Sequence, residues 1–172
     1  MADWEDKIQV KKGNIGEEIV KQFLKEKGFV IYRHELGMSH VFDMIAVKEK
    51  KQIIIAEVKT QARRNYYDDT GVSLKHYNEY QIIKQKYNLP MFLFFVDEMM
   101  KKIYGNWLSE LEKPYKVVRM GEKVIYPLKQ KGSTGIRIYF HLDKMVTIKE
   151  NIDANTINDL KSLSTRNYEY LL

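Results

Sequence analysis

Apolar residues recur at helical spacing near the start of the chain. Within residues 14–27 they fall on one side of a helix: Ile15, Ile19, Val20, Phe23 and Leu24. This period predicts an amphipathic helix. Asn14 is placed to cap its start, and Gly28 is placed to adopt the left-handed turn at its end.

Three β-rich segments follow this helix, at residues 29–34, 41–47 and 53–60. The short charged segment between the last two predicts a hairpin. A polar and aromatic loop at 61–71 then leads to a second predicted helix at 73–87, with Pro90 behind it as a stop.

Residues 91–96 are apolar without alternation, which predicts a strand buried on both faces. The order of elements to this point is α-β-β-β-α-β. Later segments are shorter, and we expect helices at 107–111 and 153–163 with strands at 115–118, 124–126 and 136–140. The chain is therefore predicted to be one α/β domain, with a core at 12–98 and a C-terminal α+β extension at 99–172.

Composition narrows the class of protein. The 172 residues contain no cysteine, which excludes disulfides and cysteine-ligated zinc and favours a reducing compartment. The first residues are polar, and no apolar run is long enough for a membrane span, so we expect a soluble cytoplasmic protein without a membrane partner. The net charge of +6 is spread evenly and slightly favours an anionic partner such as nucleic acid.

Two acids and a lysine stand out among apolar neighbours. Glu57 and Lys59 lie two residues apart on a predicted strand and therefore project from the same side. Asp43 is the single charge in the preceding strand, and the hairpin brings it beside Glu57. Charged groups in such a setting must be paired, ligated or hydrated.

Neighbouring carboxylates repel unless a cation lies between them. Mg²⁺ commonly uses one or two carboxylates together with waters and substrate phosphate. Lys59 can then stabilise the charge that grows on a phosphate, or help to position and deprotonate the attacking water. Glu17 borders the apolar stripe of the first helix and can reach the same cleft, whereas Glu18 points away. These parts suit phosphodiester hydrolysis.

The motifs that carry this arrangement are Gly13-Asn-Ile-Gly-Glu17, Lys27-Gly-Phe29, Phe42-Asp43 and Ala56-Glu57-Val58-Lys59. Together they resemble the PD-(D/E)xK nuclease superfamily, and within it the archaeal Holliday junction resolvases and related phage and prokaryotic nucleases. The resemblance covers residues 12–97, with Phe42 at the position of the family's usual proline. It implies a restriction-endonuclease-like fold with a mixed central sheet flanked by helices.

The resemblance also implies roles for single residues. Asp43 and Glu57 would bind Mg²⁺, or Mn²⁺ as a substitute, together with the main-chain carbonyl of Val58. Lys59 would assist the water, and Glu17 would complete the acidic cluster. A DNA endonuclease acting as a homodimer on double-stranded or branched DNA, in recombination or repair, is expected on this basis.

Several residues are candidates for DNA contact: Arg33, Gln61, Arg63, Arg64, Tyr66, Tyr67 and Lys84. Basic and aromatic side chains in a loop after the site suit contact with a nucleic-acid backbone or base, but an ordinary solvated loop has the same composition. For Lys84 a half-buried helix face is the favoured interpretation. His40 is a further candidate neighbour of Asp43.

Two rival functions stay open at this stage. The first is a nuclease fold retained as a DNA-binding or assembly module without turnover. The second is a nuclease that acts on RNA or works without a metal.

Overall fold

The structure is a computed structural model that describes residues 7–33, 41–49, 52–132 and 135–164. Its helices are α1 (Ile8–Glu26), α2 (Leu74–Tyr87), α3 (Leu108–Leu111) and α4 (Ala154–Ser162), with a 3₁₀ turn at Leu142–Lys144. Its strands are β1 (Val30–Arg33), β2 (Met44–Lys48), β3 (Gln52–Thr60), β4 (Asp69–Ser73), β5 (Met91–Asp97), β6 (Lys102–Trp107), β7 (Tyr115–Arg119), β8 (Glu122–Tyr126), β9 (Leu128–Gly132), β10 (Gly135–His141) and β11 (Val146–Lys149).

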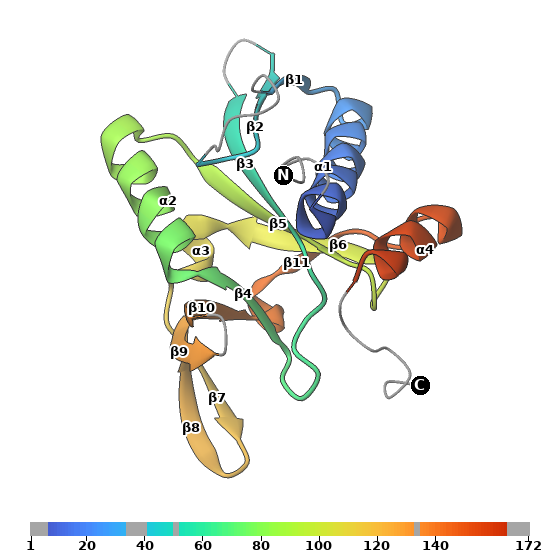
Figure 1. Cartoon of the computed structure of the whole chain (residues 1–172). Helices are drawn as coiled ribbons and strands as arrows, with labels where there is room; N and C mark the ends of the chain where they lie inside the picture. The colour runs from blue at the N-terminus through green and yellow to red at the C-terminus, as the bar shows by residue number, and fades with distance from the viewer. Residues whose placement is uncertain (1–6, 34–40, 50–51, 133–134, 165–172) are drawn as a thin grey trace.

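A six-stranded sheet forms the centre, in the order β1-β2-β3-β5-β6-β11. The pair β3 and β5 is parallel, and the other neighbours are antiparallel. The chain is thus a mixed α/β protein whose central mixed sheet is flanked by helices, with α1 and α4 on one side and α2 and α3 on the other (Figure 1).

Alternation along β3 divides the core into two layers. Ile54, Ala56 and Val58 pack in the cluster that includes residues of α1 and α4. Ile55 belongs to the other cluster, with residues of α2 and α3. Because successive side chains in a strand point to opposite faces, Glu57 projects to the α2 side and Thr60 to the α1 side.

Helix α1 begins at Ile8, earlier than the predicted start at Asn14. Lys12 in its second turn forms an ion pair of 2.5 Å with the buried Glu98, just after β5. This tertiary contact extends the helix through Gly13 and Asn14, which local preference alone would place at a boundary. The predicted end is confirmed, because Gly28 has a φ of +85°.

Helix α1 approaches β3 closely at Gly16. A Cβ atom built on Gly16 would lie 1.8 Å from Oγ1 of Thr60 and 2.9 Å from its Cβ. Only a residue without a side chain fits there. The close approach brings the next residue, Glu17, beside the end of β3.

The hairpin of β2 and β3, the helix α2 and the buried strand β5 are confirmed within a few residues of their predicted bounds. Strands β4, β6, β9 and β11 were not predicted. In β4, Asp69 and Gly71 read as turn formers, yet Asp69 is buried by its pairing with Arg64, and Gly71 lies against the backbone of β10.

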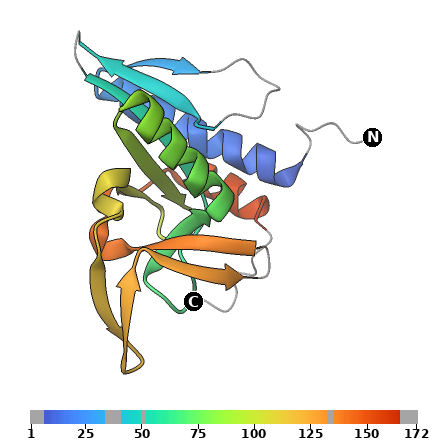
Figure 2. The same cartoon turned by 90° about the vertical axis from the view of Figure 1, so that its left-hand side faces the viewer.

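The segment after residue 99 contributes strands and a helix to the core. It supplies β6 and β11 to the central sheet, and α4 packs against α1. Strand β10 pairs with β4 and β9 in a second sheet, while β7 and β8 form a two-stranded hairpin. These strands lie beyond the central sheet, in the lower part of Figures 1 and 2. None of the helices described is both long and apolar enough to cross a membrane.

Candidate active site

The site begins where β2 stops pairing with β3. Met44 is the first β2 residue and lies opposite Ala56. One residue earlier, the backbone N–H of Asp43 donates to the carbonyl of Ala56 at 3.2 Å. The N–H of Val58 donates to Oδ2 of Asp43 at 2.6 Å. The side chain of Asp43 thus takes the place of the missing β2 backbone.

The same geometry fixes the direction of the Val58 carbonyl. The N–H and C=O groups of one strand residue point to the same neighbouring strand. Because the Val58 N–H is directed to Asp43, its carbonyl faces the side where β2 has ended. The carbonyl oxygen and the Asp43 carboxylate therefore lie at one edge of β3.

Glu57 lies on the α2 face of β3 and is 3% exposed. Its Oε1 accepts a hydrogen bond of 2.7 Å from the hydroxyl of Tyr80 and forms an ion pair with Nζ of Lys59. Its other oxygen, Oε2, is buried and has no hydrogen-bond partner among the described residues. A buried carboxylate oxygen without a hydrogen-bond partner is energetically costly, so its position calls for a structural or functional explanation.

Burial raises the pKa of Glu57 to about 7, and the charge of Asp43 adds to this rise, while Lys59 and the Tyr80 hydroxyl oppose it. For Lys59, burial lowers the pKa, but the attraction of Glu57, Asp43 and Glu17 outweighs burial and raises it overall. Lys59 therefore stays an ammonium at neutral pH, while Glu57 is poised to lose a proton.

The charge of Asp43 also helps to raise the pKa of Glu17, after the larger effect of burial. Of the four predicted catalytic side chains, Asp43 and Lys59 therefore lie within electrostatic reach of both Glu17 and Glu57. In the described segments no group of three His, Cys, Asp or Glu side chains is arranged to hold a metal ion, so Glu17, Asp43 and Glu57 do not form such a group.

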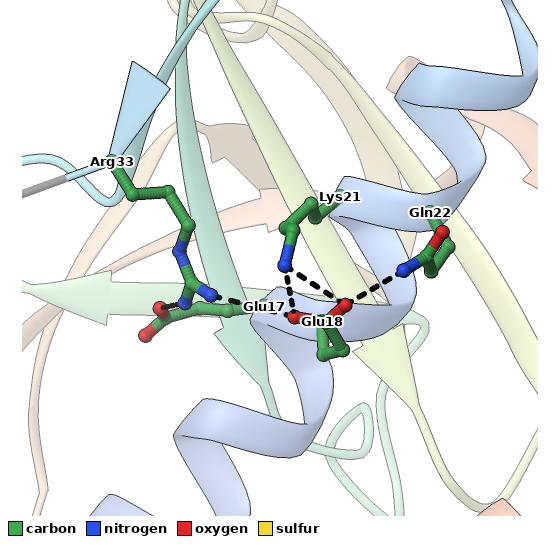
Figure 3. Close-up of polar contacts among 5 residues, drawn as sticks. All are labelled: Glu17, Glu18, Lys21, Gln22 and Arg33. Atoms are coloured by element: carbon green, nitrogen blue, oxygen red, sulfur yellow. Dashed lines mark hydrogen bonds and ion pairs between the residues drawn. The ribbon is translucent and has the colours of Figure 1, made fainter. Parts of the chain in front are cut away.

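Glu17 is turned toward β1 and forms an ion pair with Arg33 (Figure 3). Glu18 faces solvent as predicted, where it contacts Lys21, Gln22 and more distantly Arg33. Arg33 thus ties the end of β1 to α1. In this arrangement Glu17 adds negative charge near Asp43, but its carboxylate is engaged by Arg33.

The oxygen donors at the edge of β3 fit a hard divalent cation. Asp43, Glu57 and the Val58 carbonyl offer two carboxylates and one neutral oxygen, and Oε2 of Glu57 lacks any described partner. Mg²⁺ is commonly held by one or two carboxylates and completes its shell with waters and substrate phosphate. Two carboxylates and one carbonyl therefore suit such an ion in number and in kind.

Two residues of α2 that the sequence analysis did not assign to the site also belong to it. Tyr80 donates to Glu57, and the rings of His76 and Tyr80 stack with centroids 6.3 Å apart. Burial lowers the pKa of His76, and the charge of Lys59 lowers it further. Their spacing of four residues places both on one side of the helix, which is the signal that could have identified the pair.

The loop after Lys59 is largely held by the protein itself. Gln61 donates from Nε2 to Oγ1 of Thr70 at 2.8 Å and to the carbonyl of Gly71 at 2.6 Å. Arg64 makes two contacts of 2.5 Å with the buried Asp69. Gln61 and Arg64 therefore have clear structural roles.

The remaining candidates for DNA contact differ in exposure. Arg63 pairs with Asp68, and Lys84 pairs with Glu112 at 2.6 Å. Tyr66 is 89% exposed. His40 lies outside the described residues. Contact with DNA stays a prediction for the whole set.

No protein-family model and no curated protein matches the sequence. Among solved structures, the chain is similar to the 1.6 Å structure of Hjc, a Holliday junction resolvase from the archaeal hyperthermophile Archaeoglobus fulgidus. The TM-score is 0.49 and the sequence identity 10%, over 77% of this chain and 86% of the resolvase chain. Similarity at this level carries no argument about function, so function has to be argued from the residues of the chain itself.

Proposed function

We propose that the chain is a divalent-metal-dependent DNA endonuclease that hydrolyses phosphodiester bonds. The observation that carries the proposal is the buried Oε2 of Glu57, which has no hydrogen-bond partner among the described residues. Glu57 lies on strand β3, which also carries Lys59 and whose residue Val58 contacts Asp43. Mg²⁺ is the expected ion, and Mn²⁺ is its expected substitute.

Each residue has a separate task in this proposal. The bound ion would polarise the phosphate and provide an activated water. Asp43 is held for binding by the N–H of Val58, and Glu57 by the hydroxyl of Tyr80. Lys59, which keeps its proton, stabilises the negative charge that grows on the phosphate. Its raised pKa favours this role over that of a general base.

Glu17 is a supporting residue in the proposal. Its carboxylate pairs with Arg33, and it contributes to the raised pKa of Lys59. The resemblance to Holliday junction resolvases makes branched DNA the first special substrate to examine. A homodimer and a cytoplasmic location stay predictions, and sedimentation of the protein with and without DNA tests the first.

Cleavage assays test the proposal directly. Supercoiled plasmid and a four-way junction are incubated with Mg²⁺ or with EDTA, using wild type, Asp43→Asn and Lys59→Gln. We expect cleavage only with Mg²⁺ and losses of about 100-fold or more in both variants. Exposed residues provide the matched controls Asp159→Asn and Lys25→Gln, which should cleave like wild type.

The two rival functions give different outcomes. A DNA-binding module without turnover would leave both substrates intact while still binding them. A metal-independent nuclease would cleave in EDTA, and an RNA nuclease would prefer an RNA duplex of the same sequence. Cleavage that survives in both Asp43→Asn and Lys59→Gln would reject the assigned site.

A further inference from the structure

Five side chains form an alternating column across the second sheet, the loop after β3 and the β7–β8 hairpin. The column, here called the Arg–Tyr strip, consists of Arg137, Tyr139, Arg64, Tyr67 and Arg119. The guanidinium carbon of Arg64 lies 3.8 Å from the ring centre of Tyr139 and 4.5 Å from that of Tyr67. The guanidinium carbon of Arg119 lies 3.9 Å from the ring centre of Tyr67, and that of Arg137 lies 6.0 Å from the ring centre of Tyr139.

The strip draws on segments far apart in the sequence. Arg64 and Tyr67 belong to the loop after β3, Arg119 ends β7, and Arg137 and Tyr139 lie in β10. Three of the five therefore come from the part of the chain after residue 99. The resemblance to nucleases does not cover that part, for which the sequence left dimer contacts, DNA contacts and a covering role open.

Charge is unevenly compensated along the strip. Arg64, at its centre, is neutralised by two contacts with the buried Asp69. Arg137 donates to Oε1 of Gln61 at 2.9 Å and to the carbonyl of Gly71 at 2.6 Å, and neither acceptor is an ion. Nη1 of Arg119 is buried and has no hydrogen-bond partner within the described segments. The two ends of the strip thus carry positive charge without a carboxylate among these contacts.

The strip starts next to the candidate active site. Arg137 is bonded to Gln61, which follows Lys59 by two residues along the chain. A hollow of about 250 Å³ lies at this end and is lined in part by Gln61, Arg64 and Arg137. A second hollow of about 230 Å³, farther along, is lined by Arg64, Asn65, Tyr66 and Tyr67. The first hollow leaves space for a ligand beside Arg64 and Arg137, and the second leaves space beside Arg64.

We infer that the Arg–Tyr strip binds the phosphate backbone of double-stranded DNA and leads one strand to the acid-lysine site. Only the second of these steps, in which a strand is led to the acid-lysine site, rests on the proposed function. The tyrosine rings of the strip are already stacked on arginines, so they are not available for stacking on bases. Guanidinium groups suit phosphate oxygens, and contacts of this kind carry no sequence information.

Salt dependence of binding tests the inference. A labelled DNA duplex is titrated in EDTA, which prevents cleavage, at salt concentrations from 50 to 200 mM. Arg119→Gln and Arg137→Gln should each weaken binding about tenfold at 0.1 M salt and reduce the slope of log K against log salt by about 1. Two duplexes of unrelated sequence should be affected equally.

Two further variants separate charge from folding. Lys25→Gln removes a positive charge from the exposed end of α1 and should leave the salt slope unchanged. Arg119→Lys and Arg137→Lys keep the charge and should restore most of the slope. Thermal unfolding of every variant identifies any loss that comes from misfolding instead of charge.

The outcomes distinguish this inference from the proposed function. If wild type cleaves DNA but Arg119→Gln and Arg137→Gln leave the salt slope unchanged, the inference about the strip is rejected and the proposed nuclease function is kept. If wild type never cleaves but the slopes change as expected, the strip stands as a DNA-binding surface and the nuclease is wrong. An equal loss in Lys25→Gln, or no binding by wild type, overturns the strip.

Discussion

The carboxylate of Asp43 accepts a hydrogen bond of 2.6 Å from the backbone N–H of Val58. This contact binds a loop residue to the edge of β3 where β2 no longer covers it. It also explains why a charged side chain is stable beside an apolar strand, since a hydrogen bond to the ionised form compensates lost hydration. The position of the acid is therefore set before any ion is bound.

Asp43→Asn should separate ion binding from folding. The amide oxygen of Asn can still accept from the Val58 N–H, so we expect a change in the free energy of unfolding of about 1 kcal/mol or less. The charge needed for the ion is lost, so Mn²⁺ binding should weaken at least tenfold. Calorimetric titration and denaturant unfolding measure the two quantities, and a variant that binds Mn²⁺ like wild type would contradict the assignment.

Tyr80→Phe should shift the pH dependence of the site upward. The Tyr80 hydroxyl stabilises the ionised form of Glu57, so its removal should raise the pKa of Glu57 further and cost about 1–2 kcal/mol of stability. Mg²⁺-dependent cleavage should then reach its midpoint at higher pH. Tyr77→Phe is the matched control, because the Tyr77 hydroxyl contacts Glu112 instead, at 3.2 Å. Equal shifts in both variants would rule out a specific role for Tyr80.

The metal-free protein should lose stability as the pH rises from about 4.5 to about 7. Burial raises the pKa of Glu57 from its ordinary 4.5 to about 7, so in this window the folded state binds more protons than the unfolded state. Stability carried by the protonated form is then lost as the pH rises through the folded pKa.

Glu57→Gln tests that sign. Denaturant unfolding in EDTA gives the free-energy difference between the variant and wild type at each pH. This difference should move in favour of the variant between pH 4.5 and 7 and level off on either side. A flat difference across the window, or one that favours wild type as the pH rises, would show that the Glu57 carboxyl is not perturbed as described.

Gly16→Ala and Gly13→Ala should have opposite effects on stability. A Cβ on Gly16 would collide with Thr60, whereas no atom of another part of the described chain lies within 4 Å of a Cβ on Gly13. We expect the first change to cost about 1–3 kcal/mol and the second to add about 0.5–1 kcal/mol through helix propensity. Chemical denaturation checks both, and similar values for the two variants would mean that α1 does not approach β3 as described.

Much of the site could be predicted because strand alternation and hairpin return are local rules. They place Glu57 and Lys59 on one face and bring Asp43 beside β3, although the structure puts Asp43 one residue before β2 begins and not within it as predicted. The acidic border position of Glu17 also followed from helical spacing, but its ion pair with Arg33 depends on where β1 ends relative to α1. That placement depends on tertiary packing, which the periodicity of a single segment does not predict.

The later strands were missed for a related reason. Strand β6 contains Gly105, whose Cβ would lie 2.0 Å from the carbonyl oxygen of Leu93, so its glycine marks close strand packing and not a turn. Strand β4 carries the buried Asp69, which pairs with Arg64 of the preceding loop and accepts a hydrogen bond of 2.6 Å from the hydroxyl of Tyr126 in β8. In both strands the residues that argue against a sheet are explained by partners elsewhere in the chain.

The central claim is that Asp43, Glu57 and the carbonyl of Val58 hold one divalent ion at the edge of β3. A crystal grown or soaked with Mn²⁺ tests it most directly through anomalous scattering. We expect one strong peak about 2.0–2.3 Å from oxygens of all three residues, and no such peak in Asp43→Asn crystals treated alike. An ordered wild-type site without a peak, with Lys59 still paired to Glu57, would contradict it.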